Sequence, residues 1–286
     1  MQIVYHLGAH CTDEERLLRC LLRNRDALAE AGVMVPGPAR YRNLIRDTAT
    51  ALRRMPATDA TQEEVLDQIM DAGTADRLIL SWENFLSFPQ WVLRGRLYPA
   101  AGERVRGFTN IFPSFAAELH IAIRNPATFI PALFQRQRVK SVEDFLAGVD
   151  PMNLRWSEVI ADLLAHGQDM PVTVWCDEDT PLIWPEVLRS VAGVDIPMEG
   201  EDELLATIMD DQGIERLRKR MATPLPIDER RTITATLLEE HAKPEMVEMQ
   251  IDMPGWTPEL VDALTDAYEE DILRIMAMPG VRFLSA

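Results

Sequence analysis

The chain has 286 residues, of which 47% are hydrophobic and 26% charged, and its net charge at pH 7 is −17. This length allows a substantial buried core without a disulfide or a metal to hold it together. The negative charge disfavours nucleic acid and anionic membranes as partners, because it would repel both. The three cysteines form no CxxC pattern, so neither a disulfide framework nor a zinc site is expected. The first residues contain no basic leader and no long apolar run, so we expect a cytoplasmic protein.

The first segments in chain order predict the opening of an α/β fold. Residues 2–7 form a short run rich in β-branched and aromatic side chains that ends at Gly8, which indicates a buried strand and a turn. Residues 13–31 have leucines at helical spacing and are followed by Gly32, a typical helix stop. A strand, a glycine turn and a helix in this order are typical of a sheet with helices on its faces.

The middle of the chain alternates apolar runs with helical patterns. Three further strands are expected, at residues 77–81, 119–123 and 172–176. Strands separated by helices predict a parallel sheet. From about residue 182 onward the pattern is almost entirely helical and is punctuated by prolines. We therefore expect an α/β core over residues 1–182 and a mainly helical C-terminal region over residues 183–286 that packs on it.

The segment after the first strand is the first place to look for a ligand, because open parallel sheets bind ligands at the carboxyl ends of their strands. The spacing of His6, Gly8 and Thr12 resembles the loop of bacterial P-loop sulfotransferases, which reads His-x-Gly-x-x-Lys-Thr-Gly-Thr-Thr. The resemblance implies a P-loop-type parallel sheet whose loop binds the sulfate donor 3′-phosphoadenosine-5′-phosphosulfate (PAPS). It further implies that Gly8, His10, Thr12 and Arg16 contact this donor and that His6 is catalytic.

The same loop departs from the family pattern at several positions. Cys11 stands in place of the lysine, Asp13 in place of the second glycine, and Glu14 and Glu15 in place of the two hydroxyl residues. The neighbouring carboxylates raise the pKa of a thiol, so we expect Cys11 to be inert. The histidines and carboxylates of the loop do not have the spacing of a helical metal motif, so no metal is predicted.

Residues 12–15 can also be interpreted as a capping box. In this motif Thr12 accepts a hydrogen bond from the Glu15 amide, and the Glu15 side chain bonds to the Thr12 amide. Carboxylates at a helix N-terminus stabilise the helix, but they disfavour a bound anion. The loop is therefore either a helix cap or an anion site supported by Arg16 or Arg19.

A second resemblance follows the strand expected at residues 119–123. The sequence there contains Arg124, Pro126, Ala132, Phe134 and Gln135. Their order is similar to the sulfotransferase motif that binds the 3′-phosphate of the donor, except that Ala132 replaces a serine. An arginine at the carboxyl end of a strand can bind a phosphate through two hydrogen bonds. Arg124 is therefore either an anion contact or the partner of one of the many acids.

Glu83 follows the strand expected at residues 77–81, and Ser81-Trp82-Glu83 resembles the Ser-x-Glu segment of the same family. The resemblance implies a glutamate near the acceptor hydroxyl, where a carboxylate could act as the general base. The alternative is a glutamate in an ion pair or at a helix start. The densest basic patch of the sequence consists of Arg136, Arg138 and Lys140. This patch is either a solvated helix face or a surface for an anionic ligand.

Two function hypotheses remain open. If the resemblance carries over, the protein transfers a sulfuryl group from PAPS to a hydroxyl or amine acceptor without a metal, using a degenerate donor site. The rival is a non-catalytic protein of the same fold that binds a ligand or acts as a scaffold. A nucleotide-hydrolysing P-loop enzyme is not expected, because the chain has no Gly-x-x-x-x-Gly-Lys-Ser/Thr motif and no lysine before Lys140. The expected partners are a nucleotide and an acceptor, and no oligomeric state is indicated.

Overall fold

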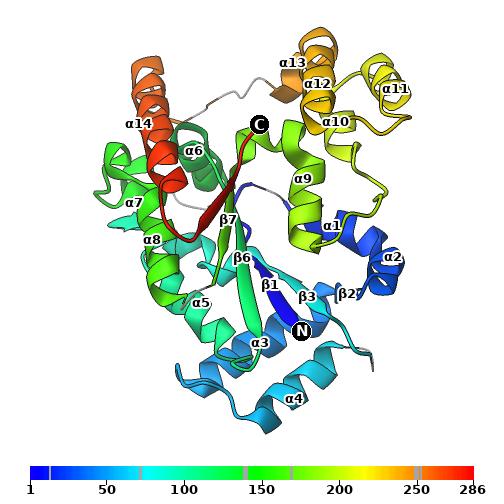
Figure 1. The fold of residues 1–286 in the computed structure, drawn as a ribbon. Helices are drawn as coiled ribbons and strands as arrows, with labels where there is room; N and C mark the ends of the chain where they lie inside the picture. Colours follow the sequence, from blue (N-terminus) through cyan, green and yellow to red (C-terminus); the bar gives the residue numbers. More distant parts are fainter. Residues whose placement is uncertain (13, 71–72, 138–140, 168–169, 248–250, 252) are drawn as a thin grey trace.

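The computed structural model describes residues 1–286 apart from 13, 71–72, 138–140, 168–169, 248–250 and 252. Its main sheet consists of β1 (Gln2–His6), β2 (Val33–Met34), β3 (Arg77–Ser81), β6 (Ala116–Ile123), β7 (Val172–Cys176) and β8 (Val281–Leu284). Within the described residues these strands form a six-stranded sheet in the order β2-β3-β1-β6-β7-β8, and every pairing is parallel. Figure 1 shows helices on both faces of this sheet, so the expected α/β fold is confirmed.

The central strands are continuous apolar runs. In β1 the side chains of residues 3–5 are at most 1% exposed, and β7 is buried along its whole length. A strand of a covered parallel sheet has a core on both faces, so its side chains are apolar whichever way they point. The strands expected at 77–81 and 172–176 have these bounds in the structure, whereas the one expected at 119–123 begins earlier, at Ala116.

The helices divide between the two faces of the sheet. One face is covered by α3 (Pro38–Leu52), α4 (Asp59–Ile69), α5 (Ala101–Thr109), α6 (Pro126–Arg136), α8 (Trp156–His166) and α14 (Pro258–Met276). The other is covered by α1 (Arg16–Arg23), α2 (Arg25–Glu30) and α9 (Thr180–Ala192). The shorter elements are η1 (Glu83–Phe85), η2 (Pro89–Trp91), β4 (Leu93–Arg94), β5 (Arg96–Leu97), α7 (Val142–Leu146), η3 (Pro151–Asn153) and η4 (Asp177–Asp179). Each face has its own core, and neighbouring residues of β1 alternate between the two cores.

The helix expected over residues 13–31 is interrupted in the structure. It is replaced by α1 and α2, which meet at Asn24. The Asn24 side chain donates to the carbonyl oxygens of Cys20 (2.8 Å) and Glu199 (2.9 Å), and it accepts from the Glu199 N–H at 2.8 Å. These hydrogen bonds compete with a continuous helix at Asn24, and the partner at Glu199 is too distant in sequence for periodicity to indicate it.

The C-terminal third is divided between the sheet and a separate group of helices. The end of the chain returns as α14 and β8, and β8 pairs with β7. The helical pattern after residue 182 did not predict β8, a short and partly exposed strand. Helices α10 (Glu203–Ile208), α11 (Asp211–Arg220), α12 (Ile227–His241) and α13 (Pro244–Val247) lie together beyond the carboxyl ends of the strands (Figure 1). We call residues 203–247 the lobe, which has a small apolar cluster of its own around Met209 and Leu217.

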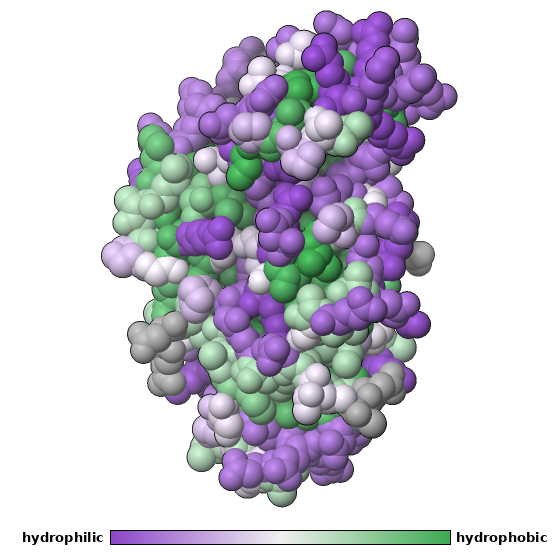
Figure 2. All heavy atoms as spheres, turned by 45° about the vertical axis from the view of Figure 1, so that its right-hand side comes forward, coloured by the Kyte–Doolittle hydropathy of each residue, from purple (hydrophilic) through white to green (hydrophobic). Residues whose placement is uncertain are grey.

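The surface over the lobe, at the top of Figure 2, is largely hydrophilic with small apolar patches. The exposed apolar side chains of the lobe include Ile227, Met246 and Val247. All three line cavities to which residues of the sheet or of α9 also contribute, so these apolar groups face the junction of lobe and core. Among the described helices, none combines the length and the apolar character that a membrane crossing requires.

Candidate functional site

The carboxyl ends of β1 and β6 mark the point where the sheet changes its direction of growth. β1 is flanked by β3 on one side and by β6 on the other. The chain adds β2 and β3 on the first side and β6, β7 and β8 on the second. Open parallel sheets bind ligands in the crevice outside their strands at such a switch point. The expected site residues all lie on or after β1, β3 and β6, so this crevice is the candidate site.

A cavity of about 390 Å³ occupies the β6 side of the crevice. Its walls come from the loop after β1, from β6 and β7, from α9 and from the lobe. The lining residues are Thr12, Arg16, Ala122, Arg124, Trp175, Asp177, Glu178, Thr180, Pro181, Trp184, Leu204, Ile208, Met246 and Val247. This switch-point cavity brings together Thr12, Arg16 and Arg124, three of the residues expected at the donor.

Two arginines supply the positive charge of the switch-point cavity. Arg124 follows β6; its Nε donates to the Thr128 hydroxyl at 3.0 Å, and its guanidinium also donates to the Cys11 carbonyl oxygen. These bonds orient the guanidinium beside the loop after β1. Arg16 is the first residue of α1, and its side chain makes no hydrogen bond or ion pair with any described residue. The cavity wall therefore contains one oriented cation and one without a partner in the described part of the chain.

Two buried polar groups of α9 lie in the same wall. The hydroxyl of Thr180 and the indole N–H of Trp184 make no hydrogen bond within the described part of the chain. Their residues are only 8% and 2% exposed. An unsatisfied buried donor costs on the order of 1–3 kcal/mol. A ligand that accepts hydrogen bonds from these groups would recover that free energy.

The two acids in the cavity wall, Glu178 and Asp177, both interact with other groups of the protein. The two oxygens of the Glu178 carboxylate accept from the Asn125 N–H at 2.8 Å and from the Tyr268 hydroxyl at 3.2 Å. Burial, with the nearby Glu178 charge, raises the pKa of Tyr268, so this hydroxyl stays a donor. Asp177 also has an interaction partner. Both acids reduce the positive potential of the two arginines.

The β3 side of the crevice is closed by an ion pair. Glu83, at the start of η1, accepts hydrogen bonds on both carboxylate oxygens from Arg136 of α6, at 2.8 and 2.7 Å. The Arg136 guanidinium also lies at the Cys11 thiol, whose pKa burial raises although Arg136 lowers it. Of the two interpretations of Glu83, the structure contains the ion pair. A carboxylate held on both oxygens must first leave its arginine before it can take a proton from an acceptor.

The two histidines of the loop are buried in the core and do not line the switch-point cavity. His6 is 1% exposed, its Nδ1 lies 2.8 Å from the Ser81 hydroxyl, and its ring stacks on Trp175. Burial, with a smaller contribution from His120, lowers the pKa of His6 to about 3. His10 is fully buried, and its N–H and its ring both bond to the Tyr98 hydroxyl at 2.9 Å.

Burial also lowers the pKa of His10 to about 4, against the opposing effect of Glu83. Both imidazoles are thus neutral at pH 7. Their hydrogen bonds hold the first strand and its loop in place, and neither ring reaches the cavity that contains Arg16 and Arg124.

The loop after β1 passes close to the chain after β3. Gly8 has φ +52°, and a Cβ at this position would lie 3.6 Å from the Glu83 backbone and 3.7 Å from the His6 ring. This region of φ is readily available to glycine. Gly8 therefore acts through backbone conformation, by turning the loop against the start of η1.

The expected capping box does not form. The Thr12 hydroxyl donates to the Ala9 carbonyl oxygen at 2.6 Å, and Glu15 caps α1 without a side-chain hydrogen bond. Glu14 and Glu15 have φ of 49° and 64°, in the left-handed region, which delays the helix until Arg16. Such φ values in non-glycine residues cost on the order of 1 kcal/mol each and concentrate at functional sites. The Glu15 carboxylate pairs instead with Arg42 of α3.

Neither Glu14 nor Glu15 lines the switch-point cavity. These two carboxylates therefore lie outside the wall that contains the two arginines. Asp13 lies outside the described residues, as do Arg138 and Lys140 of the basic patch. Arg136, the described member of that patch, is the partner of Glu83.

Three residues that form the walls of the switch-point cavity, Thr180, Trp184 and Trp175, were not predicted from the sequence. Thr180 and Trp184 lie in an ordinary amphipathic helix, and Trp175 lies in a buried strand, so each fits a core position equally well. The one available signal was that Thr180 follows the carboxyl end of β7, the edge where ligands bind in parallel sheets. No group of three or more metal-ligating side chains occurs among the residues that the structure describes.

Comparisons with protein-family models and with curated proteins found no match to this chain. The functional interpretation therefore depends on the geometry and the chemistry of the switch-point cavity.

Proposed function

We propose that this sulfotransferase-like protein binds a phosphate-bearing nucleotide in the switch-point cavity, and that binding without sulfuryl transfer is its function. One observation carries the proposal: Arg16 and Arg124 line the same cavity as the unpartnered donors of Thr180 and Trp184. PAPS, or a nucleotide with similar phosphates, is the ligand that the resemblance of the loop implies.

Charge supports an anionic ligand. A guanidinium carries five N–H donors, and those that Arg124 gives to Thr128 and Cys11 orient it toward the loop. Arg16 has no partner among the described residues, so an incoming anion displaces no ion pair with any of them. A hydrogen bond between a guanidinium and a phosphate contributes roughly 1.5–3 kcal/mol. Two such contacts would act against the general repulsion by an acidic chain.

The other walls favour a planar group beside the phosphate. Trp175 and Trp184 both line the cavity, and they provide aromatic surface together with the free N–H of Trp184. A nucleotide base has flat faces and hydrogen-bond acceptors at its edge, so it matches both features. The volume of about 390 Å³ lies in the range typical of small-molecule sites.

The second candidate is sulfuryl transfer, and the position of Arg136 favours it. Its guanidinium lies at Cys11, which occupies the position of the lysine in the family loop, so a cation is present at the expected place. Glu83 neutralises this cation with two hydrogen bonds. Transfer would require this pair to open, so that Arg136 could stabilise the leaving phosphate and Glu83 could accept the proton of the acceptor.

Calorimetric titration with adenosine 3′,5′-bisphosphate at low salt tests the binding proposal. We expect micromolar affinity, and at least about tenfold weaker binding by the Arg124→Ala variant because a charge-assisted hydrogen bond is lost. The matched control is Arg19→Ala, because Arg19 is an exposed arginine of α1 outside the cavity. Absence of both heat and thermal stabilisation in the unmodified protein would contradict binding.

A second measurement separates the two candidates. The protein is incubated with PAPS and a mixture of phenolic, alcoholic and amine acceptors, and release of adenosine 3′,5′-bisphosphate is followed. Binding without acceptor-dependent release supports the first candidate. Acceptor-dependent release that disappears in Glu83→Gln would establish the second.

A further inference from the structure

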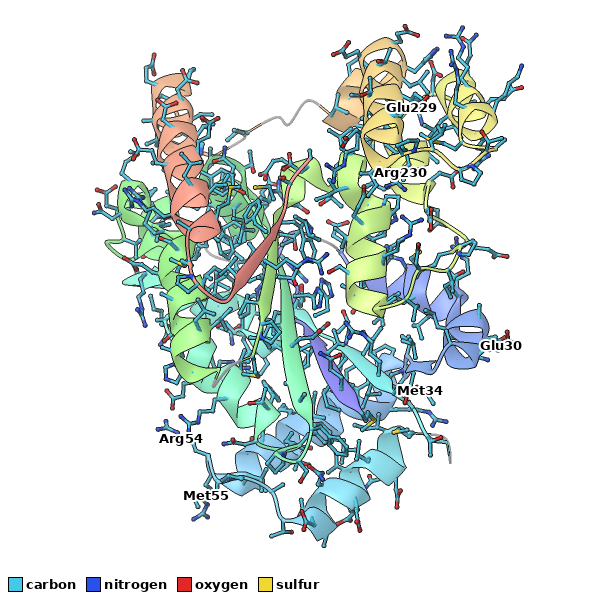
Figure 3. All side chains as sticks on the ribbon, viewed as in Figure 1. Glu30, Met34, Arg54, Met55, Glu229 and Arg230 are labelled. Carbon is cyan, nitrogen blue, oxygen red and sulfur yellow. The ribbon has the colours of Figure 1, made fainter. Side chains whose placement is uncertain are left out.

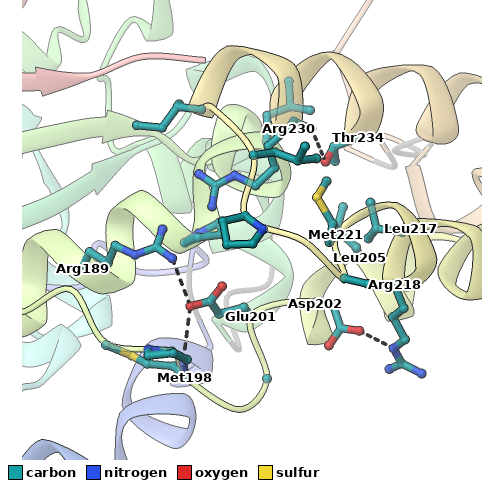
Figure 4. A pocket seen from close by; sticks show the side chains of 18 of the residues that line it. Arg189, Met198, Glu201, Asp202, Leu205, Leu217, Arg218, Met221, Arg230 and Thr234 are labelled. Atoms are coloured by element: carbon teal, nitrogen blue, oxygen red, sulfur yellow. Dashed lines mark hydrogen bonds and ion pairs between the residues drawn. The ribbon is translucent and has the colours of Figure 1, made fainter.

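A second and larger cavity lies between α9 and the lobe. Its volume is about 970 Å³, and Figure 4 shows side chains from α9, from the segment before α10 and from the lobe helices converging on it. We call it the lobe cavity. Among the described residues that line the two cavities, Pro181 is the one common to both. The two cavities use different arginines, so their ligands can be tested independently.

The walls of the lobe cavity are mainly apolar. Pro185, Pro197 and Pro224 contribute rings with a fixed backbone, and Met198 and Met221 contribute flexible apolar side chains. Proline rings restrict the backbone, whereas methionine adapts to irregular shapes. This combination suits an apolar body of the ligand more than a polar one.

Most charges at the rim of the cavity are already paired. Arg218 donates to Asp202 at 2.6 Å, and Arg189 donates to Glu201 at 3.4 Å (Figure 4). Arg189 also pairs with the exposed Asp195 at 2.7 Å. Each of these arginines has at least one carboxylate partner, so this part of the rim carries no excess positive charge.

Arg230 differs from the other arginines of the cavity. It lies on the side of α12 that faces α9 (Figure 3), and its side chain is only 18% exposed. It donates to the Glu186 carboxylate at 2.6 Å, and Arg231 lies 3.4 Å from the same oxygen of Glu186. The Nε–H of Arg230 has no hydrogen-bond partner among the described residues.

Two guanidiniums share the Glu186 carboxylate in a largely buried place. Arg231 also lies near Asp179, where its charge opposes the effect of burial, which raises the pKa of that carboxyl. A buried charged group with an unsatisfied donor is unfavourable, and a bound carboxylate would supply an acceptor and a countercharge. Arg230 lines the lobe cavity, whereas Arg231 does not, so the unsatisfied Nε–H of Arg230 belongs to the cavity wall.

We propose that the lobe cavity binds an amphipathic carboxylate, with its single negative charge at Arg230 and its apolar body against the proline and methionine walls. The protein as a whole is acidic, with a net charge of −17, so a small polar anion gains little from long-range attraction. Affinity must come from apolar burial and from one local contact. This site does not depend on the proposed nucleotide function.

Dodecanoate, at concentrations below micelle formation, is the probe for the lobe cavity. Calorimetry and thermal unfolding of the full chain should detect micromolar binding. The uncharged dodecanol should bind at least about tenfold more weakly, because it lacks the charge-assisted hydrogen bond. Acetate, which lacks the apolar body, and dodecyltrimethylammonium, which has the opposite charge, should give no stabilisation.

Two neighbouring arginines provide the matched variants. Arg230→Met should weaken dodecanoate binding by at least about tenfold, whereas Arg231→Met removes the other partner of Glu186 and should keep the affinity within about threefold. Arg230→Lys keeps the charge and serves as a second variant if Arg230→Met unfolds; it should keep a preference for dodecanoate over dodecanol. Binding of adenosine 3′,5′-bisphosphate should be equal in all three.

Three results would overturn the proposal. The first is equal binding of dodecanol and dodecanoate, which would indicate apolar adsorption alone. The second is an equal loss in Arg230→Met and Arg231→Met, which would indicate an effect through the Glu186 ion pair. The third is the absence of dodecanoate binding to the unmodified, folded protein.

Discussion

The two sides of the switch point are built from similar residues but differ in how these residues are satisfied. On the β3 side, Glu83 is held by Arg136 and Glu15 by Arg42, so charges meet charges of the same chain. On the β6 side, Arg16 has no described partner and Thr180 has an unsatisfied hydroxyl in the wall of a cavity. Polar groups that satisfy one another stabilise the fold, whereas groups left unsatisfied around a hollow are available to a ligand.

This difference bears on the choice between catalysis and binding. Glu83, which is suited to proton transfer, belongs to the β3 side, which we call the filled side. Arg16 and Arg124, which are suited to an anion, belong to the β6 side, which we call the hollow side. His6 lies between them, because its Nδ1 is at the Ser81 hydroxyl, its ring stacks on Trp175 of the cavity wall, and its Nε2 has no partner among the described residues. Each of the following predictions tests whether the two sides behave as differently as their contacts indicate.

The largest expected effect is loss of stability in acid, which comes from the buried histidines near the loop after β1. His6 and His10 have pKa values of about 3 and about 4 when folded, below the 6.5 of an unfolded chain. The unfolded state therefore binds more protons below pH 6.5, and stability falls as the pH decreases through this window. At pH 5 each histidine should cost roughly 2 kcal/mol relative to pH 8. Urea unfolding followed by tryptophan fluorescence measures this loss.

His6→Asn isolates the contribution of one histidine to this acid effect. The variant should lose the roughly 2 kcal/mol that this ring contributes at pH 5, whereas His10 and His120, whose pKa burial also lowers, keep their contributions. His166→Asn is the control, since the His166 side chain is 37% exposed. An unchanged pH dependence in His6→Asn would show that burial of this ring does not disfavour its protonation.

The next effect compares two arginines beside the loop, one on each side. Arg16→Ala should weaken adenosine 3′,5′-bisphosphate binding by about tenfold, because one charge-assisted contact is lost. Arg42→Ala should change the affinity by less than about threefold, since Arg42 pairs with Glu15 outside the cavity. Calorimetry measures the affinity of both variants for the bisphosphate. An equal loss of affinity in the two variants would mean that the ligand lies on the filled side or makes no specific contact.

Two buried threonines offer a smaller but sharper comparison. The Thr180 hydroxyl has no described partner, whereas the Thr234 hydroxyl donates to the Arg230 carbonyl oxygen at 2.9 Å. Thr180→Val should stabilise the free protein by about 1 kcal/mol, because an unsatisfied polar group is removed. Thr234→Val should destabilise it by about 1 kcal/mol because a hydrogen bond is lost.

Urea denaturation of the ligand-free variants gives both values. Thr180→Val should also bind the bisphosphate about threefold more weakly, as expected if its hydroxyl contacts the ligand. If both variants are destabilised equally, the Thr180 hydroxyl is satisfied in solution and does not mark a ligand site.

The smallest expected effect concerns the Glu83–Arg136 pair. Its side chains are 32% and 42% exposed, so Glu83→Gln should change stability by less than about 1 kcal/mol. Bisphosphate affinity should stay the same or rise slightly, because Arg136 is released. Thermal unfolding and calorimetry measure both. A large loss of affinity would mean that Glu83 belongs to the binding site, contrary to the separation of the two sides.

Periodicity predicted the sheet but not the cavity. The strands at residues 77–81 and 172–176 could be predicted because burial on both faces requires a continuous apolar run. Arg124 could be placed at the carboxyl end of a strand because the apolar run of β6 ends directly before it. The capping box was wrong because Glu14 and Glu15 adopt positive φ, and no short motif indicates that conformation. Tertiary contacts of the loop favoured this conformation over an earlier start of the helix.

The sequence by itself determined the α/β class, the parallel sheet and the edge at which its charged residues gather, because these follow from local patterns of burial. Only the tertiary structure decided that Arg136 pairs with Glu83, which is 53 residues away in the sequence. The same is true of the break in the first helix at Asn24 and of the pairing of β8 with the sheet. The tertiary structure also decided that Thr180 and Trp184 face a hollow. Pairing and cavities arise between residues distant in the chain, where sequence periodicity carries no information about contact.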